Sequence, residues 1–379
     1  MTDTIINKLR RDLLAADALW QQRRRKIDTT CIFTDLTSAA IAKRGLRHVL
    51  HESRSNYTPE ALGQARAKLP ANLFSDINKS LQDKAYRAQN EPRIFAIDGS
   101  KVHVHPCFLQ QGYTTRTNNQ AVSRPAIRPL AMLSSMLDVK TRSCYDSQIT
   151  AHFNERTSAV KHMSVAVPGD TLIFDRGYYS KNLVQAASQY KLRVVFRLKR
   201  TAFSAASSFW NSSKTRLATR VYHVDGTFTP VLLVKYFIDG KKYMNLINFN
   251  AKTDEVRRLY ALRWRVETSF KRLKSYLNLE DSHSMSAAMY IQEIQARILL
   301  DTVTQNITQL ENIDQMSPKK HQSYLRILDE VESILFTCKI ASTHRLSQKQ
   351  FCSLYVKFHP RGDIRNYSVD VVNLRQCYV

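Results

Sequence analysis

Apolar and polar residues follow three patterns along the chain. From Asp3 to about Arg87 the apolar spacing is helical, and Thr58-Pro59 is typical of an N-cap followed by a first-turn proline. After Glu91-Pro92, short apolar runs of strand character alternate with helical stretches. From Thr253 onward the spacing is again mostly helical. The pattern predicts an α/β region between two helical regions.

The α/β region contains several apolar runs that we expect to be strands. They cover residues 93–98, 131–139, 143–149, 171–175 and 192–198, with helices predicted over 154–165 and 183–190. Between 199 and 250 helical periodicity disappears, and the turn signals Asp225-Gly226 and Asp239-Gly240 separate β-rich runs. The second signal is a good hairpin candidate. One long helix is predicted over 253–277.

These boundaries divide the chain into five regions. We expect a helical N-terminal domain (1–90), the first part of an α/β core (91–200), a β-rich insertion (201–250), the last part of the core (251–290) and a helical C-terminal region (291–379). The N-terminal domain is basic and contains the run Arg23-Arg24-Arg25-Lys26, so we expect it to bind DNA.

Charge points to the class of partner. Lys and Arg number 57 against 32 Asp and Glu among 379 residues, a net charge of +25 spread along the whole chain. A long polyanion is the natural partner, because each neutralised phosphate releases counterions. The run Arg23-Arg24-Arg25-Lys26 and the basic segment from His359 to Arg365 fit this reading. No continuous apolar span suggests a membrane partner.

The N-terminus and the cysteines indicate the compartment. Residues 1–14 lack the apolar segment of a signal peptide, so we expect a cytoplasmic protein. The six cysteines lie far apart without a C-x-x-C pair, so we expect reduced thiols rather than a zinc or redox site.

Two aspartates share a local context. Asp98 and Asp175 each end an apolar, strand-like run and are followed by glycine, at once in Asp98-Gly99 and after one residue in Asp175-Arg176-Gly177. In open α/β sheets, ligands bind at the carboxyl ends of strands, so acids there face a site. Either acid alone is more often part of a turn.

The predicted long helix carries a sharper signal. At about 100° per residue, four side chains fall in one narrow wedge beside an apolar stripe: Tyr260, Arg263, Glu267 and Lys274. The alternative is a surface helix in which Arg263 merely pairs with Glu267 four residues later. That alternative explains one pair but not the alignment of four functional side chains.

Three carboxylates from two strand ends and a helix suit hard cations. Asp98, Asp175 and Glu267 are therefore the predicted catalytic residues and metal ligands, and Mg²⁺ or Mn²⁺ is the expected cofactor. Two such ions about 4 Å apart can activate the attacking oxygen and stabilise the leaving oxygen of a phosphodiester.

These motifs resemble the DDE transposases of bacterial insertion sequences, in particular the cut-and-paste IS4 type with its signature Y-x2-R-x3-E-x6-K. The signature stands without departure from Tyr260 to Lys274. The resemblance extends to Asp98-Gly99-Ser100, to Asp175-Arg176-Gly177-Tyr178 and to the β-rich segment between the second and third acids. It covers about half of the chain.

The resemblance implies an RNase H-like core in which Asp98, Asp175 and Glu267 bind two divalent ions. Water would first nick the transposon end, and the freed 3′ hydroxyl would then attack the other strand or the target DNA. Tyr260, Arg263 and Lys274 would bind phosphates near the cleaved end. The partners would be double-stranded transposon ends and target DNA, with a dimer in the synaptic complex.

Other residues are weaker candidates. Arg176 and Tyr178 follow the second acid and could contact the DNA backbone or only shape a turn. Trp210 and Trp264 are candidates by residue type for stacking on a flipped base, and whether such a base is used stays open.

Several polar residues are better explained by structure than by chemistry. His103, His105 and Cys107 alternate after Asp98, but a compact zinc site needs four ligands, so we expect ordinary strand or loop side chains. Glu155 and Asp254 are expected to be first-turn helix acids, favourable there through the helix dipole.

Two alternatives remain from sequence alone. An RNase H-like nuclease or resolvase would cut without strand transfer, and the Y-R-E-K residues together with the β-rich insertion argue against it. A domesticated, non-catalytic DNA-binding protein is the second alternative, and the presence of all three acids argues against it.

Overall fold

The computed structural model describes residues 2–21, 26–53, 55–87, 91–115, 126–282, 284–310 and 319–344. The chain forms two compact units, a sheet unit (82–271) and a helical unit (1–81 with 272–379). The basic residues Arg23 to Arg25 and the segment 359–365 lie outside the described residues.

The sheet unit is built on one mixed sheet of eight strands, so the predicted α/β class is confirmed. The strand order is β3-β2-β1-β4-β5-β8-β7-β6, with β1, β4 and β5 parallel and the other neighbours antiparallel. The strands are β1 (Ile94–His103), β2 (Leu130–Asp138), β3 (Cys144–Thr150), β4 (Thr171–Phe174), β5 (Arg193–Arg197), β6 (Arg216–Tyr222), β7 (Phe228–Ile238) and β8 (Lys241–Ile247).

The pairing of β1 with β4 sets the two aspartates side by side. Ile97 pairs with Phe174, so Asp98 and Asp175 come next at the same level of two adjacent parallel strands. The prediction that a strand ends at Asp98 is wrong, because β1 continues to His103. Only β4 ends there, at Phe174, which opens the sheet beside Asp98.

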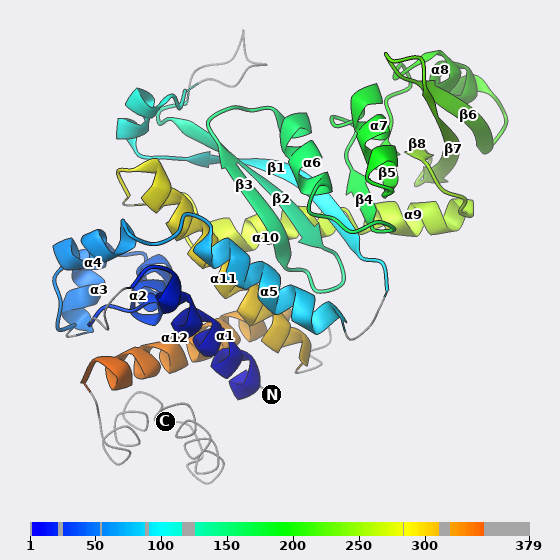
Figure 1. The fold of residues 1–379 in the computed structure, drawn as a ribbon. Coiled ribbons are helices and arrows are strands. Elements are labelled where there is room, and N and C mark those ends of the chain that lie inside the picture. The colour runs from blue at the N-terminus through cyan, green and yellow to red at the C-terminus, as the bar shows by residue number, and fades with distance from the viewer. Residues whose placement is uncertain are drawn as a thin grey trace. The chain divides into compact units, whose positions relative to one another are not determined.

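Helices cover both faces of this sheet. On one face, α6 (Glu155–Met163), α7 (Lys181–Gln189) and α8 (Ser204–Asn211) pack on a core that includes Phe95, Ile97 and Phe174. The neighbours α6 and α7 lie on this face in Figure 1. On the other face α9 (Thr253–Ala261) packs on Ile173 and Val195 through Val256. Because side chains alternate along a strand, Asp98 belongs to the α9 face and Gly99 to the α6 face.

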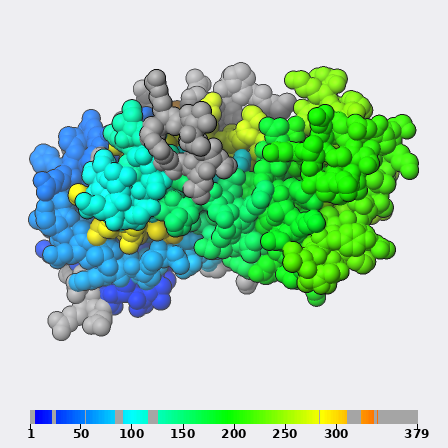
Figure 2. All heavy atoms as spheres, turned by 90° about the horizontal axis from the view of Figure 1, so that it is seen from above, coloured from blue at the N-terminus to red at the C-terminus, as the bar shows by residue number. Residues whose placement is uncertain are grey.

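The predicted β-rich insertion is part of the same sheet. β8 pairs with β5, and Figure 2 shows the insertion, in green to yellow-green, continuous with the rest of the unit. The hairpin predicted at Asp239-Gly240 is confirmed, and both residues have positive φ (48° and 72°), as a tight two-residue turn requires. The insertion also begins with the helix α8, which the sequence pattern did not indicate.

The predicted single helix over 253–277 is two helices. α9 ends at Ala261 and α10 (Trp264–Ser275) starts three residues later. Between them the backbone tightens, since the amide of Arg263 donates to the carbonyl of Tyr260 and the amide of Val266 to that of Arg263, both at 3.1 Å. Arg263 therefore lies in a turn between two helices.

The helical unit combines the two ends of the chain. It contains α1 (Thr2–Ala16), η1 (Asp17–Leu19), α2 (Thr29–Ala42), α3 (Leu46–Glu52), α4 (Pro59–Arg66), most of α5 (Leu73–Arg87), the end of α10, α11 (Ala287–Leu310) and α12 (Lys319–His344). The predicted N-cap at Thr58 is confirmed, since its hydroxyl accepts from the amide of Ala61. No helix among the described residues is long and apolar enough to cross a membrane.

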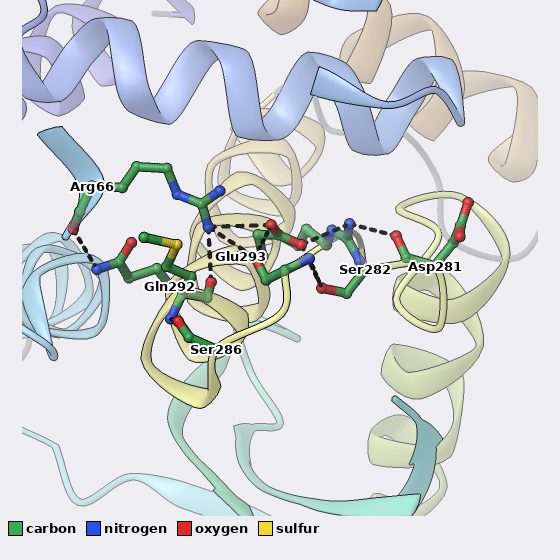
Figure 3. Close-up of polar contacts among 9 residues, drawn as sticks. Arg66, Asp281, Ser282, Ser286, Gln292 and Glu293 are labelled. Atoms are coloured by element: carbon green, nitrogen blue, oxygen red, sulfur yellow. Dashed lines mark hydrogen bonds and ion pairs between the residues drawn. The ribbon is translucent and has the colours of Figure 1, made fainter. Parts of the chain in front are cut away.

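A buried ion pair joins α4 to α11 inside the helical unit. The guanidinium of Arg66 donates to Glu293 at 3.2 Å, to Ser284 and to the carbonyl of Met289 (Figure 3). The amide of Gln292 donates back to the carbonyl of Arg66 at 3.0 Å. Arg66 and Glu293 are 4% exposed, so these bonds satisfy charges that water does not reach.

A second buried network holds α6 to the sheet. His162 contacts Asp146 of β3 at 2.6 Å through Nδ1 and Ser134 of β2 at 3.0 Å through Nε2. His162 and Ser134 are fully buried, so the order Ser-His-Asp here is structural and has no access to a substrate.

Replacing Asp146 by alanine leaves the buried Nδ1 of His162 without its partner. We expect Asp146→Ala to lose about 1 to 3 kcal/mol of stability, measured by urea unfolding. Glu91→Ala removes a carboxylate from an exposed pair with Lys140 and should change stability by less than about 0.5 kcal/mol. Equal effects of the two substitutions would contradict the structural role of the network.

Candidate active site

Residues at the turn between α9 and α10 contact all three predicted acids. The guanidinium of Arg263 donates to Asp98 at 3.1 Å through one nitrogen and to Glu267 through the other. The Arg263 side chain is only 12% exposed. A buried guanidinium needs compensating carboxylates, so Arg263 holds Asp98 and Glu267 on either side of itself.

Tyr260 brings in the third acid. Its hydroxyl donates to Asp175 at 3.0 Å, and its ring packs on the α9 face of the sheet. Burial, followed by the charge of Asp175, raises the pKa of Tyr260 to about 12, so the hydroxyl keeps its proton. Two consecutive polar residues of the signature, Tyr260 and Arg263, thus contact all three acids.

An arginine and two further tyrosines extend this cluster along the sheet. The guanidinium carbon of Arg197, at the end of β5, lies 4.6 Å from the ring centroid of Tyr243 and 6.0 Å from that of Tyr260. The ring of Tyr243 stacks on Tyr236 at 5.8 Å. Sequence reasoning missed Arg197, although it ends the strand next to the one that precedes Asp175.

The electrostatics of Asp98 differ from those of a surface carboxylate. Burial raises the pKa of Asp98 to about 6, and the charges of Glu155 and Asp175 add to the increase. The amide of Gly99, which donates to Oδ1 at 2.9 Å, and the charge of Arg263 both lower the pKa of Asp98. More negative charge gathers here than Arg263 alone balances.

The donor chemistry fits a hard divalent cation. All three acids offer carboxylate oxygens, which Mg²⁺ and Mn²⁺ prefer, and the crowding of negative charge favours a cation. Within the described ranges, no three His, Cys, Asp or Glu side chains surround a single metal position. In this arrangement Arg263 is the counter-ion of Asp98 and Glu267. Because one or two carboxylates commonly hold an Mg²⁺ ion, Asp98 and Asp175 are enough for one ion.

Lys274 and Arg176 are two further residues predicted to contact DNA. The ammonium of Lys274 forms an ion pair with Glu280 at 3.3 Å, and both belong to the helical unit. The side chain of Arg176 is exposed directly after Asp175. The sequence prediction aligned Lys274 with Tyr260 and Arg263 on one continuous helix. The helix is interrupted at Arg263, so that alignment does not hold for Lys274.

Tyr178, the other residue predicted to contact DNA, is buried. Its side chain is 1% exposed and belongs to the core on the α6 face, where the ring lies 5.4 Å from that of Phe174.

The two tryptophans differ in exposure. Trp264 is 65% exposed, whereas Trp210 packs partly against the sheet core with the ammonium of Lys242 5.2 Å from its ring centroid. Trp264 is therefore more accessible to solvent than Trp210.

Of the two histidines after Asp98, His105 has a structural contact. Nδ1 of His105 accepts from the amide of Cys107 at 3.3 Å and caps the short helix η2 (Pro106–Gln111). This contact accounts for His105 without a metal.

Glu155 is the functional candidate that sequence reasoning set aside. It lies in the first turn of α6, as predicted, but it also contributes to the raised pKa of Asp98. Its Oε1 lies 2.9 Å from where a Cβ on Gly99 would stand. The Asp-Gly pair was visible in the sequence, whereas the packing of α6 over Gly99 was not.

Comparison with known proteins identifies a matching family. A family model described as a transposase DDE domain matches residues 89–299, more than half of the 379 residues. The cryo-EM structure of a piggyBac transposase synaptic complex with hairpin DNA is similar at 12% sequence identity and a TM-score of 0.47, covering 89% of this chain and 79% of that chain. No curated protein matches the chain.

The raised pKa of Asp98 predicts a specific pH dependence. Because the folded state holds the proton up to about pH 6 and the unfolded chain only to about 3.8, ionised Asp98 lowers the stability of the fold as pH rises between these values. In EDTA, Asp98→Asn should therefore gain about 1 to 3 kcal/mol over the wild type between pH 4 and pH 7, measured by urea unfolding. A difference that is the same at both pH values would contradict this assignment.

Proposed function

This chain belongs to the transposase DDE domain family, and we propose that it is a cut-and-paste transposase of an IS4-type bacterial insertion sequence. It would excise the element by hydrolysing phosphodiesters at its ends and insert it by strand transfer. Asp98, Asp175 and Glu267 are the proposed catalytic residues.

One observation carries the assignment of the site. Tyr260 and Arg263 of the signature contact Asp175, Asp98 and Glu267 directly. A surface helix with a single Arg-Glu pair would have no contact to acids on two strands. The contacts therefore support a site built from β1, β4 and the α9–α10 turn.

The acids are the residues that would hold the metal ions. Bound Mg²⁺ or Mn²⁺, in two copies, would supply Lewis-acid chemistry to the attacking and leaving oxygens of the phosphodiester. Asp98 is suited to be shared between the two positions because it lies beside Asp175 on one side and is joined through Arg263 to Glu267 on the other.

Arg263 and Tyr260 are the proposed phosphate-binding groups. Arg263 balances Asp98 and Glu267 without substrate, and its planar guanidinium also suits a phosphate. When the acids acquire other counter-ions, Arg263 can turn its donors to the scissile phosphate. Tyr260 keeps its proton and orients Asp175, so that the carboxylate does not rotate away from Asp98.

Charge supports double-stranded DNA as the partner. The net charge of +25 matches a polyanion, and the proposed partners are the transposon ends and the target DNA, held by a dimer during synapsis. Arg176 and Lys274 are proposed to contact the DNA backbone, and the bacterial cytoplasm is the proposed location. Family membership favours this function over a nuclease without strand transfer.

Removing either acid on its own should abolish chemistry but not binding. We expect Asp175→Ala and Glu267→Ala to reduce Mg²⁺-dependent nicking of the element's own end sequence by at least 1,000-fold, with end binding within about threefold of wild type. The control is Asp254→Ala, which removes an exposed first-turn acid of α9. Substantial nicking by either active-site variant would overturn the assignment.

The hydroxyl of Tyr260 should matter separately from its ring. Tyr260→Phe keeps the packing on the sheet but removes the donor to Asp175, so we expect a roughly tenfold or greater loss of nicking rate and little change in melting temperature. Tyr243→Phe is the matched control, since it removes a neighbouring hydroxyl from the same aromatic group. Equal losses in the two variants would argue against a specific role of Tyr260.

A further inference from the structure

The first turn of α6 packs close to the two segments that carry Asp98 and Asp175. Oε1 of Glu155 lies 2.9 Å from where a Cβ on Gly99 would stand, so any larger residue at Gly99 would displace the carboxylate. Arg156, the next residue, donates to the carbonyl of Gly177, two residues after Asp175, at 3.1 Å. Glu155 is therefore placed between the segments that carry Asp98 and Asp175.

The open end of the sheet lets this side chain approach the site. Glu155 comes from the α6 face, whereas Asp98 belongs to the α9 face. Because β4 stops at Phe174, no strand continues beside Asp98 to separate the two faces on that side. Carboxylates from both faces can meet over this edge.

Glu155 has no counter-ion of its own there. It forms no hydrogen bond or ion pair within the part of the chain that is described, although Lys101 and Arg156 act on it at longer range. Burial, then the charge of Asp175, raises the pKa of Glu155. A partly buried carboxylate beside two other acids is unfavourable unless a cation is shared among them.

A buried hydroxyl points to the same place. Tyr178 is 1% exposed, and its hydroxyl has no hydrogen-bond partner. Its ring lies 5.4 Å from that of Phe174, the residue before Asp175. Burial raises the pKa of Tyr178 well above its usual value, and the charges of Glu155, Asp98 and Asp175 raise it further. A buried donor without a partner is unfavourable, so its position calls for a ligand, such as a cation-bound water or a reoriented carboxylate.

We infer that Glu155 is a fourth carboxylate of the divalent-cation site, acting with Asp98 and Asp175, and that the hydroxyl of Tyr178 positions it or a water bound beside it. Gly99 favours this arrangement because its missing side chain leaves room for the Glu155 carboxylate. The inference rests on the proposed function, in which Asp98 and Asp175 bind the cation. It adds a ligand from α6 to a site otherwise built from β1, β4 and α10.

The test measures Mn²⁺ binding to the full-length, EDTA-treated protein without DNA, by titration calorimetry. We expect Glu155→Gln to weaken Mn²⁺ affinity at least tenfold, and Tyr178→Phe at least threefold. Asp254→Asn is the matched control, since Asp254 is also a first-turn helix acid but exposed and outside the cluster, and it should bind Mn²⁺ as the wild type does.

Melting temperatures distinguish a ligand from a structural residue. Glu155→Gln removes repulsion among the acids, so it should melt above the wild type in EDTA and gain less from added Mn²⁺. A structural role of Glu155 predicts a lower melting temperature in both conditions and would overturn the inference.

Asp175→Asn separates this inference from the function on which it rests. Weakened binding in Asp175→Asn but wild-type affinity in Glu155→Gln overturns the fourth ligand and leaves the proposed site standing. Unchanged affinity in Asp175→Asn overturns the proposed metal site itself. Wild-type affinity in Tyr178→Phe removes the positioning role of the hydroxyl.

Discussion

The parallel pairing of β1 with β4 is the constraint on which the rest of the candidate site depends. Adjacent strands lie about 4.8 Å apart, so the register that aligns Ile97 with Phe174 also forces Asp98 and Asp175 together. Burial raises the pKa of Asp98, and the charges of Glu155 and Asp175 add to the increase. The charge of Arg263 lowers the pKa of Asp98, because the α9–α10 turn brings the guanidinium to 3.1 Å from the carboxylate.

Sequence patterns located most of the strands and helices because their signals are local. Apolar runs marked β1 to β5, and the positive φ values required by Asp239-Gly240 could be anticipated from the residue types. The break at Arg263 could not, since Ala-Leu-Arg-Trp contains no glycine or proline and each residue tolerates a helix. Contacts of Arg263 with Asp98 on a strand far away in sequence accompany the tighter turn.

The same distinction applies to the candidate site. The identities of the three acids followed from sequence context and resemblance, whereas their partners depended on packing. A first-turn glutamate such as Glu155 looks the same in sequence whether it stabilises a helix end or faces a cluster of acids. Tyr178 is a second example, because its place after an acid left open whether it contacts DNA or shapes a turn, and the structure buries it. Long-range neighbours decide such cases, and a single sequence does not list them.

The pairing of the insertion with the sheet determines where the chain tolerates a change in length. β8 is hydrogen bonded to β5, and β5 to β4, so a residue added within β8 would slip the ladder and turn every following side chain to the opposite face. The turn at Asp225-Gly226, between β6 and β7 at the far edge, carries no such penalty. A longer turn there would leave the register of every strand unchanged, whereas the strands nearer the acids have to keep their length.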